Sequence, residues 1–334
     1  MPERLPLFDA LKGFAILMVV YTHVLQFAGI GYYLDNPVFE FTYAFHMPLF
    51  MTISGYFSAS SLQRPLPELL RRKAVALLLP CLTAGVLVVL LNRTFHWAPQ
   101  YARPTYLLFN LWYLKSLFGC YLVAWLSLRG ARGSLPGAIA GSLLASLFLP
   151  GLFHWPFMLP FFWLGYAWRR RPDWFVRNGR WAGLLAAGLF IALWQVWSGG
   201  MTVYIRPLRL VDYRHLAWAG KNLLPHLLRL AIGLAGTAAS ITLFTALYRH
   251  RLRFRFLERL GRCTLEIYVL HFSLIHLSLF RHLTVPYVSG IYEGIVCPLG
   301  TALFIAACLL LIRLANRSNL LRLLVFGKSE NPVQ

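Results

Sequence analysis

The sequence predicts an all-α fold, a polytopic transmembrane helix bundle with about ten spans and both termini in the cytoplasm. Of its 334 residues, 58% are hydrophobic and only 13% are charged, and the mean hydropathy is +0.60. Apolar runs of about 17 to 25 residues, each long enough to cross a bilayer, recur along the whole chain. A water-soluble domain of this size does not need so much apolar sequence. We expect one integral membrane domain over residues 1–334.

The apolar runs define the expected spans. They lie at 7–30, 38–60, 74–92, 105–128, 134–150, 153–168, 181–198, 222–248, 263–283 and 290–312. If the N-terminus is inside, most Lys and Arg residues fall in cytoplasmic segments, which is the positive-inside bias. The first run is too long for a signal-peptide core and lacks a small-x-small cleavage site, so we expect it to be retained.

The net charge of +21 has a topological explanation. In a soluble protein such a charge would suggest nucleic acid as a partner, but basic loops beside a membrane have anionic lipid as their expected partner. The five cysteines lie in apolar runs or at their ends without metal-ligand spacing. We therefore expect no nucleic acid, no metal site and no disulfide framework.

The first apolar run carries three polar residues, Asp9, Lys12 and His23. Lys12 and His23 are about three helical turns apart, so they share a face at a separation of about 16 Å along the axis. Asp9 lies within roughly 40° of the same line. Ionisable groups at membrane depth are costly and usually mark a pathway or a reaction centre.

The second run, FHMPLFMTISGYF, contains His46. Counted along their helices, His23 and His46 reach similar levels in the outer half of the membrane. The two imidazoles could line one cavity on adjacent antiparallel helices. Alternatively, each one simply bonds a backbone carbonyl within the bundle.

Several cations lie at or inside the apolar runs. Arg71, Arg72 and Lys73 precede the third run, either as a topology anchor or as a landing site for phosphates. Lys115 lies near the middle of the fourth run, and we favour a position lining a cavity over a purely structural pairing. Arg229 lies about two turns inside the eighth run, and we expect it to face the interior.

The ninth run provides a third candidate wall of the cavity. Thr264, Tyr268 and His271 share one helical face, and Glu266 lies off that face. A polar stripe on a spanning helix must face protein or water. The segment 199–221 mixes aromatic and charged residues, which suits a sugar or lipid headgroup and equally an interfacial helix.

Taken together, these motifs resemble the membrane-bound acyltransferase-3 family of O-acyltransferases, the bacterial inner-membrane O-acetyltransferase type. The first run is similar to the family's Asp-x-Leu-(Arg/Lys)-Gly motif followed by a histidine, here Asp9, Leu11, Lys12, Gly13 and His23. Three further segments resemble later family motifs, namely FHMPLFMTISGYF (45–57), LWYL (111–114) and GRCTLEIYVLH (261–271). One departure is that Lys73 and Ala76 stand where members often carry an arginine pair ahead of the proline, here Pro80.

The resemblance implies an acyl-CoA donor that enters from the cytoplasm and transfer of its acyl group to a hydroxyl of a glycan or glycolipid. Acetyl is the default acyl group, and acetyl-CoA is then a substrate rather than a permanently bound cofactor. The family's essential histidine corresponds to His23, and its basic partner corresponds to Lys12. The expected location is the inner (plasma) membrane of a bacterium.

We therefore predict that His23 is the general base, with Lys12 and His46 as its catalytic partners. Direct transfer and a covalent acyl intermediate both remain open, and the absence of a Gly-x-Ser-x-Gly elbow speaks against a serine hydrolase. The expected acyl-CoA ligands are Lys12, Arg71, Arg72 and Lys73. The cavity or acceptor candidates are Asp9, Lys115, Glu266, Tyr268, His271 and Arg229.

The alternative function is a membrane transporter or flippase for a glycan or lipid intermediate. Such a protein would also bury histidines and cations around a cavity. Its usual sequence indication is a pair of matched halves or inverted repeats, and the sequence has neither.

Overall fold

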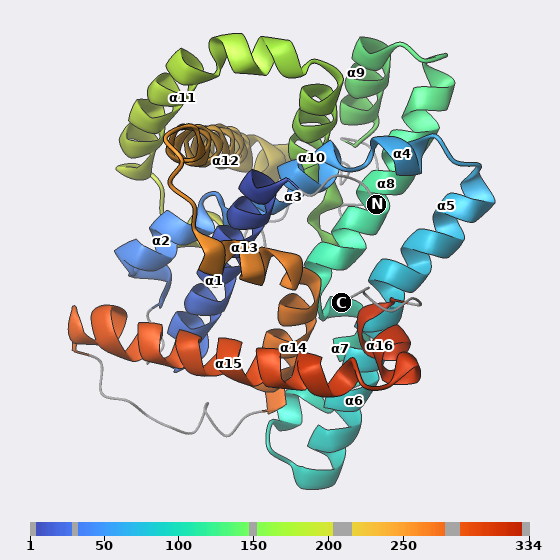
Figure 1. Ribbon diagram of the computed structural model, residues 1–334, viewed down its shortest axis with the longest axis vertical. Helices are drawn as coiled ribbons and strands as arrows, with labels where there is room; N and C mark the ends of the chain where they lie inside the picture. Colours follow the sequence, from blue (N-terminus) through green and yellow to red (C-terminus); the bar gives the residue numbers. More distant parts are fainter. Residues whose placement is uncertain (1–4, 29–32, 147–151, 203–215, 278–287, 329–334) are drawn as a thin grey trace.

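The computed structural model describes residues 5–28, 33–146, 152–202, 216–277 and 288–328, and these residues form helices and no strand (Figure 1). The all-α prediction is confirmed. The helices are α1 (Pro6–Ala28), α2 (Pro37–Tyr43), α3 (His46–Tyr56), α4 (Ala59–Leu62), α5 (Leu66–Lys73), α6 (Leu79–Phe95), α7 (Tyr106–Phe109), α8 (Trp112–Gly130), α9 (Leu135–Ser146), α10 (Trp155–Arg170), α11 (Pro172–Trp194), α12 (Leu216–Arg249), α13 (Arg255–Arg262), α14 (Thr264–Leu277), α15 (Cys297–Ala315) and α16 (Asn319–Phe326).

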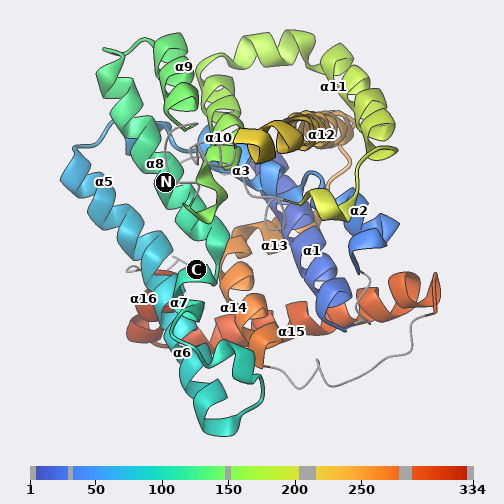
Figure 2. The same ribbon diagram turned by 180° about the vertical axis from the view of Figure 1, so that it is seen from behind.

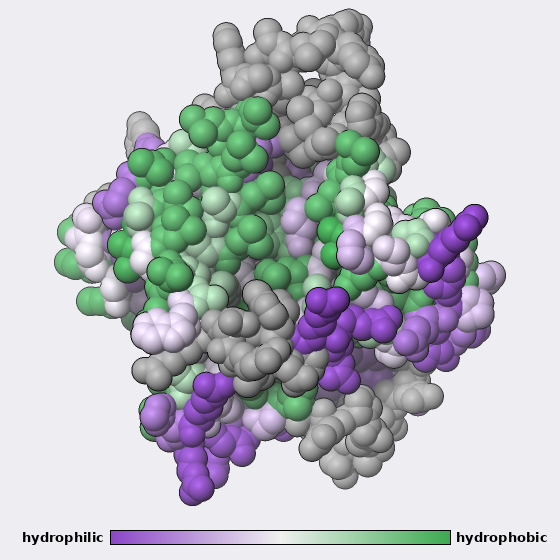
Figure 3. Space-filling model, turned by 90° about the horizontal axis from the view of Figure 1, so that it is seen from above, coloured by the Kyte–Doolittle hydropathy of each residue, from purple (hydrophilic) through white to green (hydrophobic). Residues whose placement is uncertain are grey.

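Four of the described helical segments are long and apolar enough to cross a membrane. They are Pro6–Phe27, Leu66–Phe95, Leu223–Arg249 and Tyr292–Ala315, and three shorter apolar helices accompany them. Large hydrophobic side chains remain on the outside, for example Trp181 and Leu185 on α11. The space-filling view shows a broad apolar face next to hydrophilic clusters (Figure 3). These features fit a bundle in lipid, while the count of ten spans and the side of each terminus stay predictions.

Two of the expected spans are broken helices. In the second, α2 ends at Tyr43 and α3 begins at His46, because Pro48 has no N–H and its ring would clash with the carbonyl of Ala44 in a continuous helix. In the fourth, α7 and α8 are separated at Asn110 and Leu111, where Leu111 adopts a positive φ of 44°. Breaks of this kind are tolerated in membrane proteins when neighbouring groups bond the freed backbone.

The third expected span begins earlier than predicted. The helical segment runs from Leu66 to Phe95 and includes one π-helical turn, Ala74–Leu78, between α5 and α6. The basic residues 71–73 therefore belong to the helix itself and not to a preceding loop. Single π-helical turns inside α-helices are frequent at functional sites.

Helix α1 is central and packs against α2, α3, α12, α13, α14 and α15. Its closest approach is to α13, where two glycines allow the backbones to touch. A Cβ on Gly13 would lie 1.9 Å from the Leu257 carbonyl oxygen, and one on Gly261 would lie 1.8 Å from the Asp9 carbonyl oxygen. Both glycines belong to the sequence motifs, and close packing explains why a side chain does not fit there.

Helix α14 follows α13 directly and lies beside α1, α6 and α15. Both ribbon views place α14 between α1 and α8 (Figures 1 and 2). The polar residues of the first and ninth expected spans are thereby brought together, although they are far apart in the sequence.

Candidate active site

A cavity of about 500 Å³ lies among α1, α3, α8, α13 and α14. This volume is within the range of sites that hold small organic molecules. Five charged residues line it: Asp9, Lys12, Arg262, Glu266 and Lys328. Its uncharged wall includes Met47, Phe50, Phe57, Tyr113, Leu117, Tyr121 and Tyr268.

The charged end of the cavity contains two ion pairs. Lys12 Nζ lies 3.4 Å from Asp9 Oδ1, and Lys328 Nζ bonds Glu266 Oε1. Arg262 is exposed and has no hydrogen bond or ion pair to any described residue. This end therefore carries three cations against two carboxylates.

The cavity changes character along α14. Thr264 and Glu266 line it near the charged end, and Tyr268 lines it one turn later. The Tyr113 ring lies 5.9 Å from the Tyr268 ring, centroid to centroid, and its hydroxyl is 3.0 Å from Ser54 Oγ. The end away from the charges is thus made of aromatic rings with hydroxyl groups.

A pair of histidines lies immediately behind this aromatic end. The ring centroids of Tyr268 and His271 are 5.7 Å apart, and His271 Nε2 is 2.9 Å from His23 Nδ1. The two imidazoles stack with an interplanar angle of 15°. His271 is fully buried, whereas His23 is only partly buried. Neither histidine lines the cavity itself, and Tyr268 is the lining residue whose ring contacts His271.

The hydrogen bonds of the pair define its tautomers. His271 Nδ1 is 2.7 Å from the Ile267 carbonyl oxygen, and a carbonyl can only accept, so Nδ1 carries the proton. In the neutral ring His271 Nε2 is then the acceptor, and His23 Nδ1 donates to it. The free lone pair of His23 is consequently on Nε2, and this nitrogen can accept a proton as a general base.

His46 is buried at 2% exposure and donates from Nδ1 to the Thr42 carbonyl oxygen at 2.6 Å. Within the described residues it has no hydrogen bond to His23. The two positions are still connected, because the hydroxyls of Thr22 and Thr42 lie 3.1 Å apart. His46 Nδ1 thus bonds a backbone carbonyl, as in the second of the two alternatives. The neighbouring Met47, and not His46, lines the cavity.

Lys115 is not among the residues that line this cavity. Its ammonium donates to the carbonyls of Leu107, Leu108 and Asn110 and to the Asn110 side-chain oxygen, at 2.7–2.9 Å. These carbonyls are left without helical partners where α7 ends. The lysine thus stabilises the break between α7 and α8, a role that needs neither a carboxylate nor water.

Arg229 is also away from this cavity. It is 3% exposed, and its guanidinium donates to the Met201 carbonyl oxygen and lies 5.4 Å from the Phe157 ring centroid. It borders a separate cavity of about 20 Å³. Most of the segment 199–221, considered as an acceptor site, lies outside the described residues.

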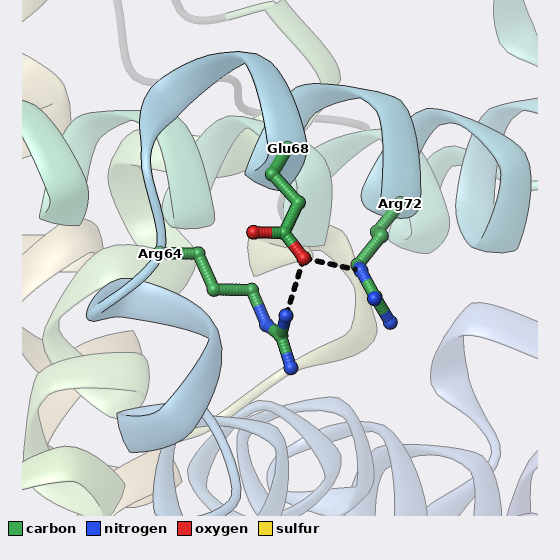
Figure 4. A network of polar contacts seen from close by, with 3 residues as sticks. All are labelled: Arg64, Glu68 and Arg72. Atoms are coloured by element: carbon green, nitrogen blue, oxygen red, sulfur yellow. Dashed lines mark hydrogen bonds and ion pairs between the residues drawn. The ribbon is translucent and has the colours of Figure 1, made fainter.

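The predicted phosphate ligands on α5 point in different directions. Arg72 and Arg64 share one oxygen of Glu68, with Arg72 Nε at 2.9 Å (Figure 4). Arg71 is exposed. Lys73 Nζ lies 3.9 Å above the ring centroid of Tyr121, which lines the cavity. Of these cations Lys73 is the one that contacts a residue of the cavity wall.

Sequence reasoning missed Arg262, Lys328 and Tyr113 as lining residues. Arg262 and Tyr113 are inside two of the motifs, GRCTLEIYVLH and LWYL, but these motifs do not indicate which of their side chains face inward. No sequence motif includes Lys328, because it follows the last apolar run. It reaches the cavity through the packing of α16.

Residues 6–313 match the family described as "Acyltransferase domain", the acyltransferase-3 family, which is nearly the whole chain. Two curated proteins are similar to a shorter part of it. Nodulation protein NolL of Mesorhizobium japonicum is 40% identical over 79 residues, 22% of this chain and 21% of that protein. Nodulation protein NolL of Sinorhizobium fredii is 39% identical over 79 residues, 22% of each chain. The match thus spans about a fifth of the length of these relatives.

No solved structure matches the chain. The family match covers the histidine pair, the helices that position it and the cavity lining apart from Lys328, which lies beyond residue 313. The apolar helices fit an integral membrane protein. The chain belongs to the acyltransferase-3 family.

Proposed function

We propose that the protein transfers an acyl group, acetyl by default, from acyl-CoA to a hydroxyl of a cell-surface or lipid-linked carbohydrate. One observation carries the proposal. The cavity is lined by the cation Lys12 and by Tyr268, whose ring centroid lies 5.7 Å from that of His271 in the His23–His271 pair. An anionic donor with a long, thin, uncharged arm fits such a cavity, because its charges and its reacting thioester are far apart.

In the proposed reaction the acceptor hydroxyl lies at His23 Nε2. As its oxygen attacks the thioester carbonyl, Nε2 takes the hydroxyl proton, and the C–S bond then breaks. The CoA thiolate leaves and receives that proton from the imidazolium, which restores the neutral ring. The Tyr113 hydroxyl, held near Ser54, provides an O–H donor for charge that develops on the carbonyl oxygen.

His271 supports this chemistry without touching the reacting atoms. Its Nε2 accepts from His23 Nδ1, which keeps the His23 lone pair on Nε2 and stabilises the imidazolium when it forms. His271 is itself fixed by the Ile267 carbonyl. We therefore assign His23 as the catalytic base and His271 as a positioning residue.

The location follows from the same arrangement. We infer that the protein has about ten spans in the inner membrane of a bacterium, with Lys12 near the cytoplasmic side, where CoA thioesters are available. The positive-inside distribution of Lys and Arg supports this orientation, and the curated relatives come from bacteria.

Membranes containing the protein, incubated with acetyl-CoA labelled in the acetyl group, test the proposal. The expected result is label bound covalently to carbohydrate and its loss in His23→Ala membranes. Movement of an unlabelled glycan across the membrane without label transfer would instead assign the protein to the transporters. Label retained on the protein after denaturation would replace direct transfer with an acyl-enzyme intermediate.

A further inference from the structure

The segment after α16 brings a side chain into the cavity from a part of the sequence with no motif. Lys328 lines the charged end together with Lys12 and Arg262. Its side chain is 43% exposed, whereas the side chain of Glu266, to which its ammonium bonds, is only 9% exposed. The lysine can therefore reach both its carboxylate and a ligand in the cavity.

The backbone at this position is held from several sides. Gly327 has a φ of +64°, and a Cβ there would lie 2.2 Å from the Val75 carbonyl oxygen in the π-helical turn. The Thr83 hydroxyl bonds the Leu324 carbonyl. These contacts fix the end of α16 against the wall formed by Ala74–Leu78 and α6.

Arg322 adds a second constraint. It is 1% exposed, its Nε lies 3.5 Å from the Lys328 carbonyl oxygen, and its own carbonyl accepts from the Lys328 N–H at 3.4 Å. These contacts connect a buried guanidinium to the backbone of Lys328 and add to the constraints on its position.

We propose that Lys328 is a donor-binding residue that contacts the phosphate groups of the CoA moiety, with Arg262 beside it and Glu266 holding the ammonium in place. The inference rests on the proposed function and names the part of the donor that this end of the cavity binds. Three cations against two carboxylates leave a positive surplus there, and Arg262, whose charge also acts on Glu258, makes no hydrogen bond or close ion pair with a described residue. Phosphate oxygens are suitable acceptors for both cation types.

Binding of CoA to the purified protein in nanodiscs of zwitterionic lipid tests this assignment without catalysis. Lys328→Gln should weaken CoA binding about 5- to 20-fold, and Lys328→Arg should bind nearly as well as wild type. The matched control is Arg317→Gln, because Arg317 is exposed on the turn before α16 and does not line the cavity. It removes the same charge nearby and should change binding less than about twofold.

The double variant Glu266→Gln/Lys328→Gln separates binding from folding, because it leaves no unpaired buried carboxylate. It should unfold like wild type and still bind CoA weakly. Equal CoA binding by Lys328→Gln and Arg317→Gln would overturn the Lys328 assignment alone. A Lys328 effect seen only in nanodiscs with anionic lipid would overturn it too and assign the lysine to a headgroup. If the wild-type protein does not bind CoA, the assignment of acyl-CoA as the donor in the proposed function is contradicted as well.

Discussion

The charged end of the cavity and the histidine pair behind its aromatic end differ in exposure and in hydrogen bonding. At the charged end, Lys12, Arg262 and Lys328 are partly or largely exposed, and Lys12 and Lys328 pair with Asp9 and Glu266. At the aromatic end, His271 is fully buried and each of its ring nitrogens has a partner within 2.9 Å. The first end can adapt to a ligand, whereas the second defines a single tautomer.

This difference predicts which substitutions affect donor binding and which affect the chemical step. A partly exposed cation contributes to binding through charge, which neighbouring cations can partly replace and salt can screen. The His23–His271 pair depends on which nitrogen carries each proton. No neighbouring side chain can take over that arrangement. We therefore expect changes at the aromatic end to act on the chemical step and changes at the charged end to act on donor affinity.

The largest effect is expected for His23→Ala. Loss of the base should lower acyl transfer about 1,000-fold, the middle of the range for general-base catalysis. CoA binding should be unchanged, because His23 does not line the cavity. Transfer at more than a tenth of the wild-type rate would contradict its role as base.

The next effect is expected for His271→Ala. Without its acceptor, His23 Nδ1–H is no longer held, and kcat should fall about 10- to 100-fold with little change in the KM for acyl-CoA. The control is Ser273→Ala, since this serine is buried on the same helix and its one hydrogen bond within the described part of the chain is to the Val269 carbonyl. A rise in KM alone would show that His271 acts on binding instead.

Gly13→Ala tests the contact that places α1 against α13. The added methyl group would meet the Leu257 carbonyl, and overpacking of this kind costs about 1–3 kcal/mol. Thermal unfolding in detergent should show a lower Tm. Gly188→Ala on α11 is the matched control, because nothing lies within 4 Å of a Cβ there. Equal Tm values for the two variants would disprove the close contact.

A smaller effect on affinity is expected for Lys12→Gln. Removing one of three cations at the charged end should raise the KM for acyl-CoA about 5- to 10-fold and leave kcat within about twofold. Lys12→Arg should restore most of the affinity. A large fall in kcat at saturating donor would mean that Lys12 takes part in the chemical step.

The smallest effect concerns Glu258, which holds the turn that leads into α13. Arg253 donates to both of its oxygens, at 3.0 and 2.6 Å, and these hydrogen bonds lower the pKa of the Glu258 carboxyl. Because the folded pKa is below the unfolded value of about 4.3, this stabilisation is present at neutral pH and is lost as the pH falls through the lowered pKa.

Glu258→Gln should therefore lower the Tm modestly at pH 7, and the difference from wild type should shrink in acid. A difference that grows as the pH falls would have the wrong sign for a lowered pKa. The activity of the variant at neutral pH should stay close to wild type, because Glu258 does not line the cavity.

The sequence predicted the helical class, the family and the meeting of the first and ninth apolar runs, because these depend on composition and on local motifs. It could also have predicted the break ahead of Pro48 from proline geometry. It could not predict that the Lys115 ammonium bonds four oxygens, since those acceptors exist only after α7 ends. Lys328 is a similar case, because its position depends on how α16 packs against the π-helical turn.

The central claim is that the cavity leads the donor from Lys12 to the histidine pair. A structure with a non-hydrolysable thioether analogue of acetyl-CoA tests it most directly. We predict phosphates beside Arg262 and Lys328, an arm that runs past Lys12 and Tyr113, and the acyl group beside Tyr268 within reach of His23. An analogue bound on another face of the protein, with this cavity still empty, would contradict the account.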